Sequence, residues 1–321
     1  FALDALERLA ISETDLEVRL ALACALVRLP PEDRARIAGA LVSATEPGAE
    51  RFAATPPGAG PAEAAPRALG GNHHDLGAML FVGLLPAIPL DPEGIGDVWS
   101  AGCASGAEAS HWPGLRRAIV RRLAAGDAAS GLSRVLAAAA DEGAAGFDDC
   151  LAGLADGWRG RHRVAAPEGW ADLRAALDDL PHDDEAHALR LERAARLDAL
   201  FGNERGVDRL VTIVRDRGLP AERRAAALDA LVDVRAGAAT ALGRESLGEP
   251  GLTLAAIRAL LVAGDTEDAG RLLAILPRLD GLARDAARDA LASRAAWGHA
   301  LLDARSEEHT SELQSRQYLV C

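Results

Sequence analysis

The sequence predicts an all-α fold, an α-solenoid of short helix pairs. About 70 of the 321 residues are alanine, far above average usage, and alanine is the strongest helix former. Aromatic residues make up only 3% of the chain, so the core must be built from small aliphatic side chains. One helical motif recurs at intervals near 30 residues, and no stretch shows the period-2 alternation of β-branched or aromatic residues typical of a sheet.

The N-terminal residues 1–44 are expected to form the first helices. Apolar residues over 14–29 fall at helical spacing, which predicts an amphipathic helix. Pro30 and Pro31 end it, and Pro31 is suited to the first position of a second helix running to about Ser43.

Residues 45–72 are rich in alanine, glycine and proline and are expected to form a linker or insertion. Helical periodicity then resumes and continues over 73–304, interrupted at short intervals by Gly, Pro, Asn or Asp. We therefore expect the main α-solenoid to span 73–304.

Internal repeats are clearest in the C-terminal half. The segment 224–232 recurs as 253–261 and then as 284–292, with successive intervals of 29 and 31 residues, and further copies occupy 19–27 and 193–201. The shared pattern is Arg (once Thr), five residues, then Ala-Leu. A structural unit repeated at this period is typical of solenoid proteins.

Second helices are expected between these copies, at 206–217 and 269–276. Alanines allow neighbouring helices to approach closely, and leucines fill the layer between successive pairs. Tetratricopeptide and ankyrin patterns need aromatic residues or a Thr-Pro-Leu-His string that this chain lacks. Short HEAT-like repeats remain, because they require only small and aliphatic residues at helical spacing.

Composition excludes several enzyme classes. The chain contains no lysine, so all 35 basic residues are arginine. This absence excludes the sites that need a lysine: the P-loop, Schiff-base enzymes, the Ser-x-x-Lys nucleophile and protein kinases. The sequence also lacks Gly-x-Ser-x-Gly, Gly-x-Gly-x-x-Gly and His-Glu-x-x-His motifs. We therefore expect no catalytic residue. The net charge of -13 argues against a dedicated nucleic-acid-binding protein.

The four cysteines are scattered at Cys24, Cys103, Cys150 and Cys321, without a Cys-x-x-Cys or Cys-x-x-Cys-His motif. No zinc or covalent haem site is indicated in this stretch, and we expect no cofactor. Scattered cysteines of this kind are expected to be small buried hydrophobic residues.

Two histidine-containing segments are candidate metal sites. In His73-His74-Asp75 the adjacent imidazoles would point about 100° apart on a helix, which disfavours a shared ion. The segment His182-Asp183-Asp184-Glu185 with His187 offers oxygen and nitrogen ligands. However, acidic residues just after Pro181 are equally typical of a helix N-terminus, so no metal site is predicted.

The ends of the chain look unlike the rest. It begins at Phe1 without a signal segment, and residues 305–315 resemble a translated DNA-sequencing adapter over eleven consecutive positions. We interpret 305–321 as an artefactual tail and the chain as a fragment. The longest apolar run, 79–90, is interrupted by prolines and shorter than the roughly 20 residues of a membrane span.

The candidate binding residues are basic and aromatic. One group lies on a predicted helix and the other follows in a loop, and together they comprise Arg116, Arg117, Arg121, Arg122, Trp158, Arg159, Arg161 and Arg163. Arginines beside a tryptophan could bind phosphate, nucleic acid or an acidic partner. The alternative is a solvated charge set around a core tryptophan; the remaining tryptophans, Trp99, Trp112, Trp170 and Trp297, are expected in the core or at helix caps.

With the helix pairs in place, residues 14–304 resemble the HEAT-repeat segment of large exported dehydrogenase-like proteins of planctomycete- and verrucomicrobia-type bacteria. The similarity is strongest over 290–304, where Ser-Arg, a nearby Trp, Leu-Leu and Asp-Ala follow in order. It extends to 151–163, which ends in Gly-Trp-Arg-Gly-Arg, and to the helix at 191–201. In that family a β-propeller precedes the repeats and a c-type cytochrome domain with Cys-x-x-Cys-His follows them.

The resemblance implies a periplasmic scaffold or spacer whose partners are the propeller and cytochrome c domains of the parent chain. No nucleic-acid partner and no membrane span are expected. Two alternatives stay open: a HEAT-like lyase that attaches bilin pigments, and a nucleic-acid-binding HEAT-like solenoid that would use the arginines named above.

Overall fold

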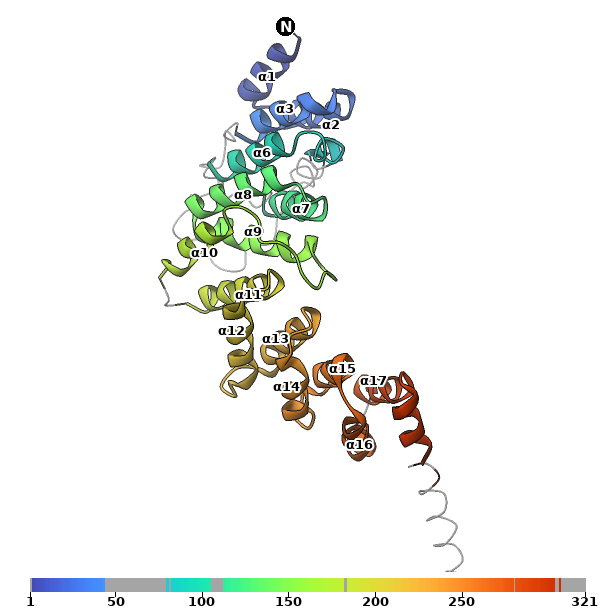
Figure 1. Cartoon of the computed structure of the whole chain (residues 1–321). Helices are drawn as coiled ribbons and strands as arrows, with labels where there is room; N and C mark the ends of the chain where they lie inside the picture. Colours follow the sequence, from blue (N-terminus) through green and yellow to red (C-terminus); the bar gives the residue numbers. More distant parts are fainter. Residues whose placement is uncertain are drawn as a thin grey trace, which may run out of the picture. The chain divides into compact units, whose positions relative to one another are not determined.

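The chain is all-α, as predicted. The structure is a computed structural model that describes residues 2–43, 79–80, 82–104, 112–181, 184–279, 281–303 and 306. Over these residues it contains helices and turns and no strand, and the helices pack in a solenoid-like succession (Figure 1). The predicted linker at 45–72 and the predicted tail at 305–321, apart from Ser306, lie outside the described residues.

The chain divides into two compact units, which are described separately: Phe1–Arg159 with Ala165–Ala194, and Gly160–Val164 with Ala195–Cys321. The helices of unit 1 are α1 (Ala2–Ser12), α2 (Leu16–Ala25), the 3-10 turn η1 (Leu26–Arg28), α3 (Pro31–Ser43), α6 (Pro92–Ala104), α7 (Trp112–Ala125), α8 (Ala129–Glu142), α9 (Ala144–Gly157) and α10 (Trp170–Asp178). Helix α11 (Glu185–Leu200) contributes its first part to unit 1 and its last turns to unit 2.

Unit 2 continues the alternation of short helices and tight turns. Its elements are α12 (Glu204–Arg215), α13 (Ala221–Asp233), α14 (Ala238–Ser246), α15 (Thr253–Ala263), α16 (Thr266–Ile275), the 3-10 turn η2 (Leu276–Arg278), α17 (Gly281–Ala292) and a helix over 295–303.

Local side-chain chemistry sets many helix ends. The Asp15 carboxylate accepts hydrogen bonds from the amides of Glu17 and Val18 and so caps α2. Asp265 and Asp268 form a reciprocal capping box at the start of α16. The helix predicted over 14–29 is α2 with η1, and the helix predicted from Pro31 to Ser43 is α3 with the same bounds.

In unit 1 the helices form two rows. α3, α6, α8 and α10 contact one another in that order, while α7 and α9 pack side by side in a second row and also contact α8 (Figure 1). Helices α6 and α8 therefore bury one face within their own row and another against the second row.

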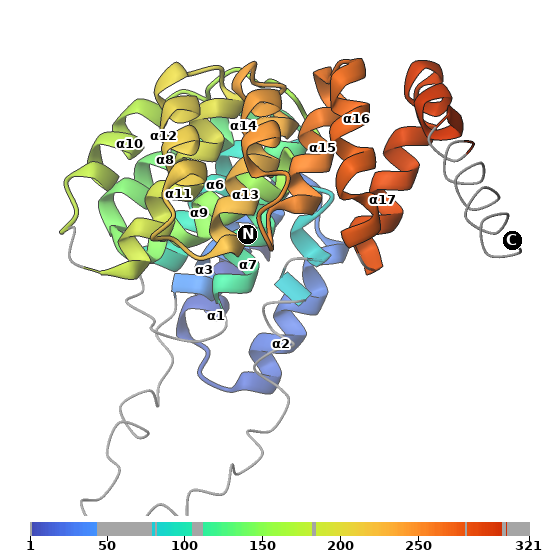
Figure 2. The same ribbon diagram turned by 90° about the horizontal axis from the view of Figure 1, so that it is seen from below.

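Unit 2 repeats this arrangement, and the sequence repeats coincide with it. The copies at 224–232, 253–261 and 284–292 lie in α13, α15 and α17, which contact one another in succession (Figure 2). The predicted second helices at 206–217 and 269–276 correspond to α12 and α16, and α14 is another member of that set. The period of about 30 residues is thus one helix pair.

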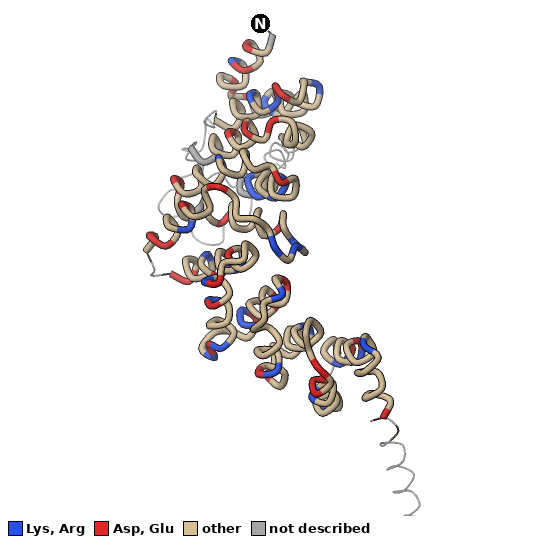
Figure 3. Tube along the Cα trace, viewed as in Figure 1, with Lys and Arg blue, Asp and Glu red and all other residues tan. Residues whose placement is uncertain are grey.

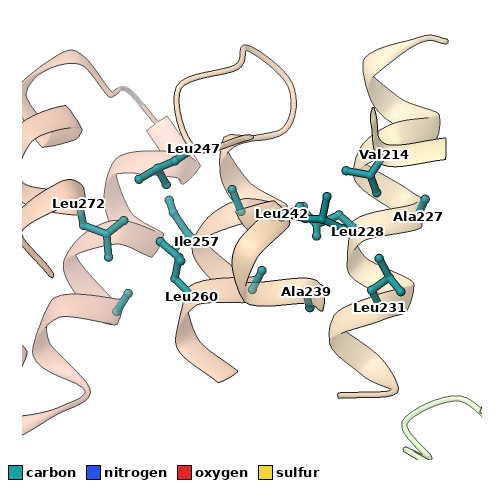
Figure 4. Packing of buried hydrophobic residues seen from close by; sticks show 14 of the residues in the cluster. Val214, Ala227, Leu228, Leu231, Ala239, Leu242, Leu247, Ile257, Leu260 and Leu272 are labelled. Carbon is teal, nitrogen blue, oxygen red and sulfur yellow. The ribbon is translucent and has the colours of Figure 1, made fainter. Parts of the chain in front are cut away.

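The core of unit 2 consists of leucines and alanines from successive helices. Leu228 and Leu231 of α13, Leu242 of α14 and Leu260 of α15 are essentially inaccessible to solvent, and Figure 4 shows them between the helices. Alanines such as Ala239 are equally buried. Small side chains of this kind give the close packing that the low aromatic content predicted.

The cysteine prediction is correct for one described side chain and wrong for another. Cys150 of α9 is buried, whereas Cys24 of α2 is exposed. Cys24 follows the buried Ala23, and one step along a helix turns the side chain by about 100° toward solvent. The side chains of Cys103 and Cys321 lie outside the described part of the structure.

Glycines bring α7 and α9 into close contact. A Cβ at Gly153 would lie 2.5 Å from the Val120 Cβ and 2.8 Å from the Arg117 carbonyl oxygen. A Cβ at Gly157, one turn later, would lie 2.6 Å from the Ala124 Cβ. Neither position of α9 can carry a side chain without moving the helices apart.

We expect Gly153→Ala to lower the free energy of unfolding by about 1–3 kcal/mol, because the added methyl group overpacks this contact. The matched control is Gly114→Ala in α7, where no atom lies within 4 Å of the new methyl group. That control should be neutral or stabilising by up to about 1 kcal/mol through helix propensity. Urea denaturation of both variants measures the effect, and equal changes of the same sign would contradict the assignment.

Several arginines bind the carbonyl groups at helix ends. The buried Arg224 donates from Nε to the Val214 carbonyl at the end of α12, 2.8 Å away, and from Nη1 to Glu249. Arg34 likewise donates to the carbonyls of Leu29, Val27 and Gly83. These donors satisfy carbonyls that a helix terminus leaves without an intrahelical partner.

Replacing Arg224 by Met should cost about 2–4 kcal/mol, because it leaves the Val214 carbonyl without its side-chain donor and leaves Glu249 with only its weaker pair to Arg217. Arg258 is the control, since its pair with Asp229 is solvent-exposed and its loss should cost less than about 1 kcal/mol. Guanidinium denaturation of Arg224→Met and Arg258→Met compares the two. Similar losses in the free energy of unfolding of the two variants would show that the contribution of Arg224 to stability does not come from the burial of its guanidinium.

Candidate binding surfaces

The first candidate residue, Arg116, lies in the core of unit 1 and is only 8% exposed, so its prediction as a surface residue is wrong. It shares one face of α7 with Val120 and Leu123, at i+4 and i+7, and this face packs on α9 and α8. The spacing of basic residues suggested a surface patch, but the helical position puts Arg116 inside.

Arg116 is held by two carboxylates and one aromatic ring. Its Nε donates to Asp149 Oδ2 at 2.7 Å, and its Nη1 donates to Glu142 Oε1 at 2.7 Å. The guanidinium also lies over the ring of the fully buried Trp99, 5.6 Å from its centroid. One cation therefore faces two acids, and the cluster carries an excess negative charge when both are ionised.

The pKa of the Asp149 carboxyl is raised in this cluster. Burial raises its pKa to about 6, against the opposing attraction of Arg116, and the nearby charges of Glu142 and Asp148 add to the rise. Asp148 itself pairs with Arg190 and Arg193 of α11. The cluster links α7, α8 and α9, and it is a structural feature rather than a binding surface.

Four other arginines form an exposed surface in unit 1. Arg117, Arg121 and Arg122 lie on the exposed side of α7, and Arg159 follows the end of α9; we call these four residues the arginine surface. Figure 3 colours basic positions blue along α7 and in the segment after α9. Asp156 accepts from Arg117 Nε at 2.8 Å and from Arg159 Nη2 at 2.5 Å. Although burial opposes it, the two arginines hold the pKa of Asp156 below its ordinary value of 3.8.

The rest of the predicted loop cluster is divided between the units. Trp158 follows the last residue of α9 and is 3% exposed, so its prediction as a binding-surface residue is wrong and the alternative of a core tryptophan is correct. Arg161 and Arg163 belong to unit 2. Between them His162 Nδ1 lies 2.7 Å from the Asp233 carbonyl oxygen, and Arg235 lies 3.1 Å from its Nε2.

The remaining predicted positions are structural where they are described. Trp99, Trp170 and Trp297 are buried, and the side chain of Trp112 lies outside the described residues. The Asp184 carboxylate accepts from the amide of His187, 2.6 Å away, and so caps α11. His73 to Asp75 and His182-Asp183 lie outside the described residues. Over the described chain, no three His, Cys, Asp or Glu side chains gather as a metal site.

Sequence reasoning missed an apolar groove in unit 2. It has a volume of about 630 Å³ and lies among the α14–α15 turn, the first turn of α15, the end of α16 with η2, and the start of α17. Its larger apolar side chains are Leu247, Leu254, Ile275, Leu279 and Leu282. Leu282 is 79% exposed, although its helix otherwise buries its leucine and alanine face. The only hint in the sequence is a leucine directly after Asp280-Gly281.

No family model matches the chain, and no curated protein and no solved structure is similar enough to it to count as a match. Among the helices that the structure describes, none combines the length and apolarity needed to cross a membrane.

The raised pKa of Asp149 beside Arg116 predicts that the free energy of unfolding depends on pH. Because the folded pKa of Asp149 is about 6 and its ordinary value is 3.8, folding favours the protonated acid. The resulting stabilisation is complete below about pH 4 and is lost as the pH rises through 6, a loss of about 3 kcal/mol. Asp149→Asn cannot ionise and should lack this loss.

The measurement is the free energy of unfolding of both proteins between about pH 4 and pH 7. The stability of the wild type relative to Asp149→Asn should fall across this range. Asp156→Asn is the control: the pKa of Asp156 is lowered below its ordinary value of 3.8, so its stabilisation is lost only below about pH 4, and the difference between the wild type and this variant should stay nearly constant across the range. A wild-type to Asp149→Asn difference that does not change with pH would contradict the prediction.

Proposed function

We propose that the chain is a non-catalytic scaffold of the HEAT-repeat kind that holds other protein domains by contact. The observation that carries the proposal is the apolar groove of unit 2. Large exposed apolar side chains in a concave surface are typical of sites for protein partners. Among the residues that the structure describes, the groove is lined by apolar side chains and glycines apart from Arg278 and the Thr253 hydroxyl, which suits a partner's apolar residues better than a chemical reaction.

The helix-pair architecture supports the same proposal. Each repeat contacts only its neighbours, so the groove is formed by short elements that are rigidly packed on the core below. A preformed apolar site loses little conformational entropy when a partner binds.

The proposal extends to the parent protein through the resemblance of 290–304. In this extended form the scaffold lies in an exported, periplasmic protein between a β-propeller and a c-type cytochrome domain. The expected finding is a Cys-x-x-Cys-His motif downstream of the repeats in the full-length gene. A gene that encodes no such motif would remove the electron-transfer context and leave the scaffold proposal standing.

Leu282→Asp should weaken partner binding roughly 10- to 100-fold, because burying one leucine contributes about 1.5–3 kcal/mol. The probes are peptides selected from a displayed random library on the immobilised wild-type chain, with affinities measured by fluorescence anisotropy. We expect the selected peptides to carry leucine-like residues.

Leu302→Asp is the matched control, because Leu302 is 62% exposed in the same unit but does not line the groove. Its affinity for the peptides should equal that of the wild type. Failure to select any peptide, or equal losses in the two variants, would argue against the groove as the contact site.

A further inference from the structure

The arginine surface of unit 1 lies on a part of the chain that serves neither the core nor the groove. Arg117 is 52% and Arg159 is 79% exposed at the side chain, and Arg121 and Arg122 are also exposed. In a chain with a net charge of -13, an exposed group of four arginines is a local reversal of the prevailing charge.

Glycine packing holds the two parts of this surface together. A Cβ at Gly157 would lie 2.6 Å from the Arg121 carbonyl oxygen, so the end of α9 touches the turn of α7 that carries Arg121. Arg159 follows two residues later and bonds to Asp156, which also binds Arg117. Rigid helices therefore position the arginines; the surface does not depend on a free loop.

The charge of the surface is only partly compensated. Asp156 is shared by Arg117 and Arg159, which leaves one positive charge in excess in that group of three. Arg121 and Arg122 have no carboxylate partner in the part of the chain that the structure describes. The surface therefore has a surplus of about three positive charges on two adjoining helix turns.

We propose that the arginine surface binds an acidic segment of a partner protein. Guanidinium groups donate in a planar fork that matches a carboxylate, and those of Arg121 and Arg122 are available for such pairing. A nucleic acid fits less well, because Arg117 to Arg122 span only about 8 Å along the helix and the Asp156 carboxylate lies within the surface. The site differs from the apolar groove, so this proposal goes beyond the scaffold contact argued above.

The test is fluorescence anisotropy of a labelled oligoglutamate peptide with the full chain at low ionic strength, where exposed ion pairs are least screened. Arg121→Gln/Arg122→Gln should raise the Kd about tenfold. The matched control is Arg205→Gln/Arg209→Gln, which removes the same charge from the exposed side of α12 in unit 2 and should leave the Kd within about twofold. Circular dichroism confirms that both variants keep their helices.

A labelled DNA duplex of equal charge is the second probe. Peptide binding that is lost only in the α7 variant supports the proposal. Equal losses in both variants, no measurable peptide binding by the wild type, or tighter binding of the duplex through the same arginines would each overturn it. None of these outcomes depends on Leu282, so the result is independent of the groove experiment.

Discussion

Close approach of neighbouring helices is the constraint on which the rest of the structure depends. With few aromatic residues the chain cannot bridge wide gaps between helices, so stability requires alanine and glycine at the contacts. Gly153 and Gly157 show the constraint in its strictest form, since α7 leaves no room there for even a methyl group. In the same way, alanines of α13 and α15 accompany the leucines that fill the layers of unit 2.

Tightly packed short helices also need donors for their terminal carbonyl groups. The last turn of each helix leaves these carbonyls without an intrahelical partner, and the next layer buries them. Arginine meets this requirement in both units. Arg34 and Arg224 are each the last residue of a Leu-Pro-x-Glu-x-Arg string. Each donates to a carbonyl at the end of the preceding helix. The long guanidinium side chain, with five donors, can satisfy a carbonyl and a carboxylate at once.

The same residue type also links successive repeats. Arg134 of α8 pairs with α6, Arg215 of α12 with α14, and Arg258 of α15 with α13. Exposed pairs of this kind each contribute little energy, but they favour one register between neighbouring helices. An acidic chain with arginine as its only strong base can therefore commit many arginines to structure, and Arg121 and Arg122 of the arginine surface are among those that remain available for a partner.

Sequence patterns alone predict the helical class, the repeat of about 30 residues and several helix bounds, because helix periodicity and capping depend on residues within one or two turns. The bounds of α3 and the places of α13, α15 and α17 were predicted in this way. Only the tertiary structure decided that Arg116 is buried, that Asp156 joins Arg117 to Arg159, and that Leu282 lines an open groove. Burial and exposure are set by which helix packs on which face, and those contacts join residues tens of positions apart.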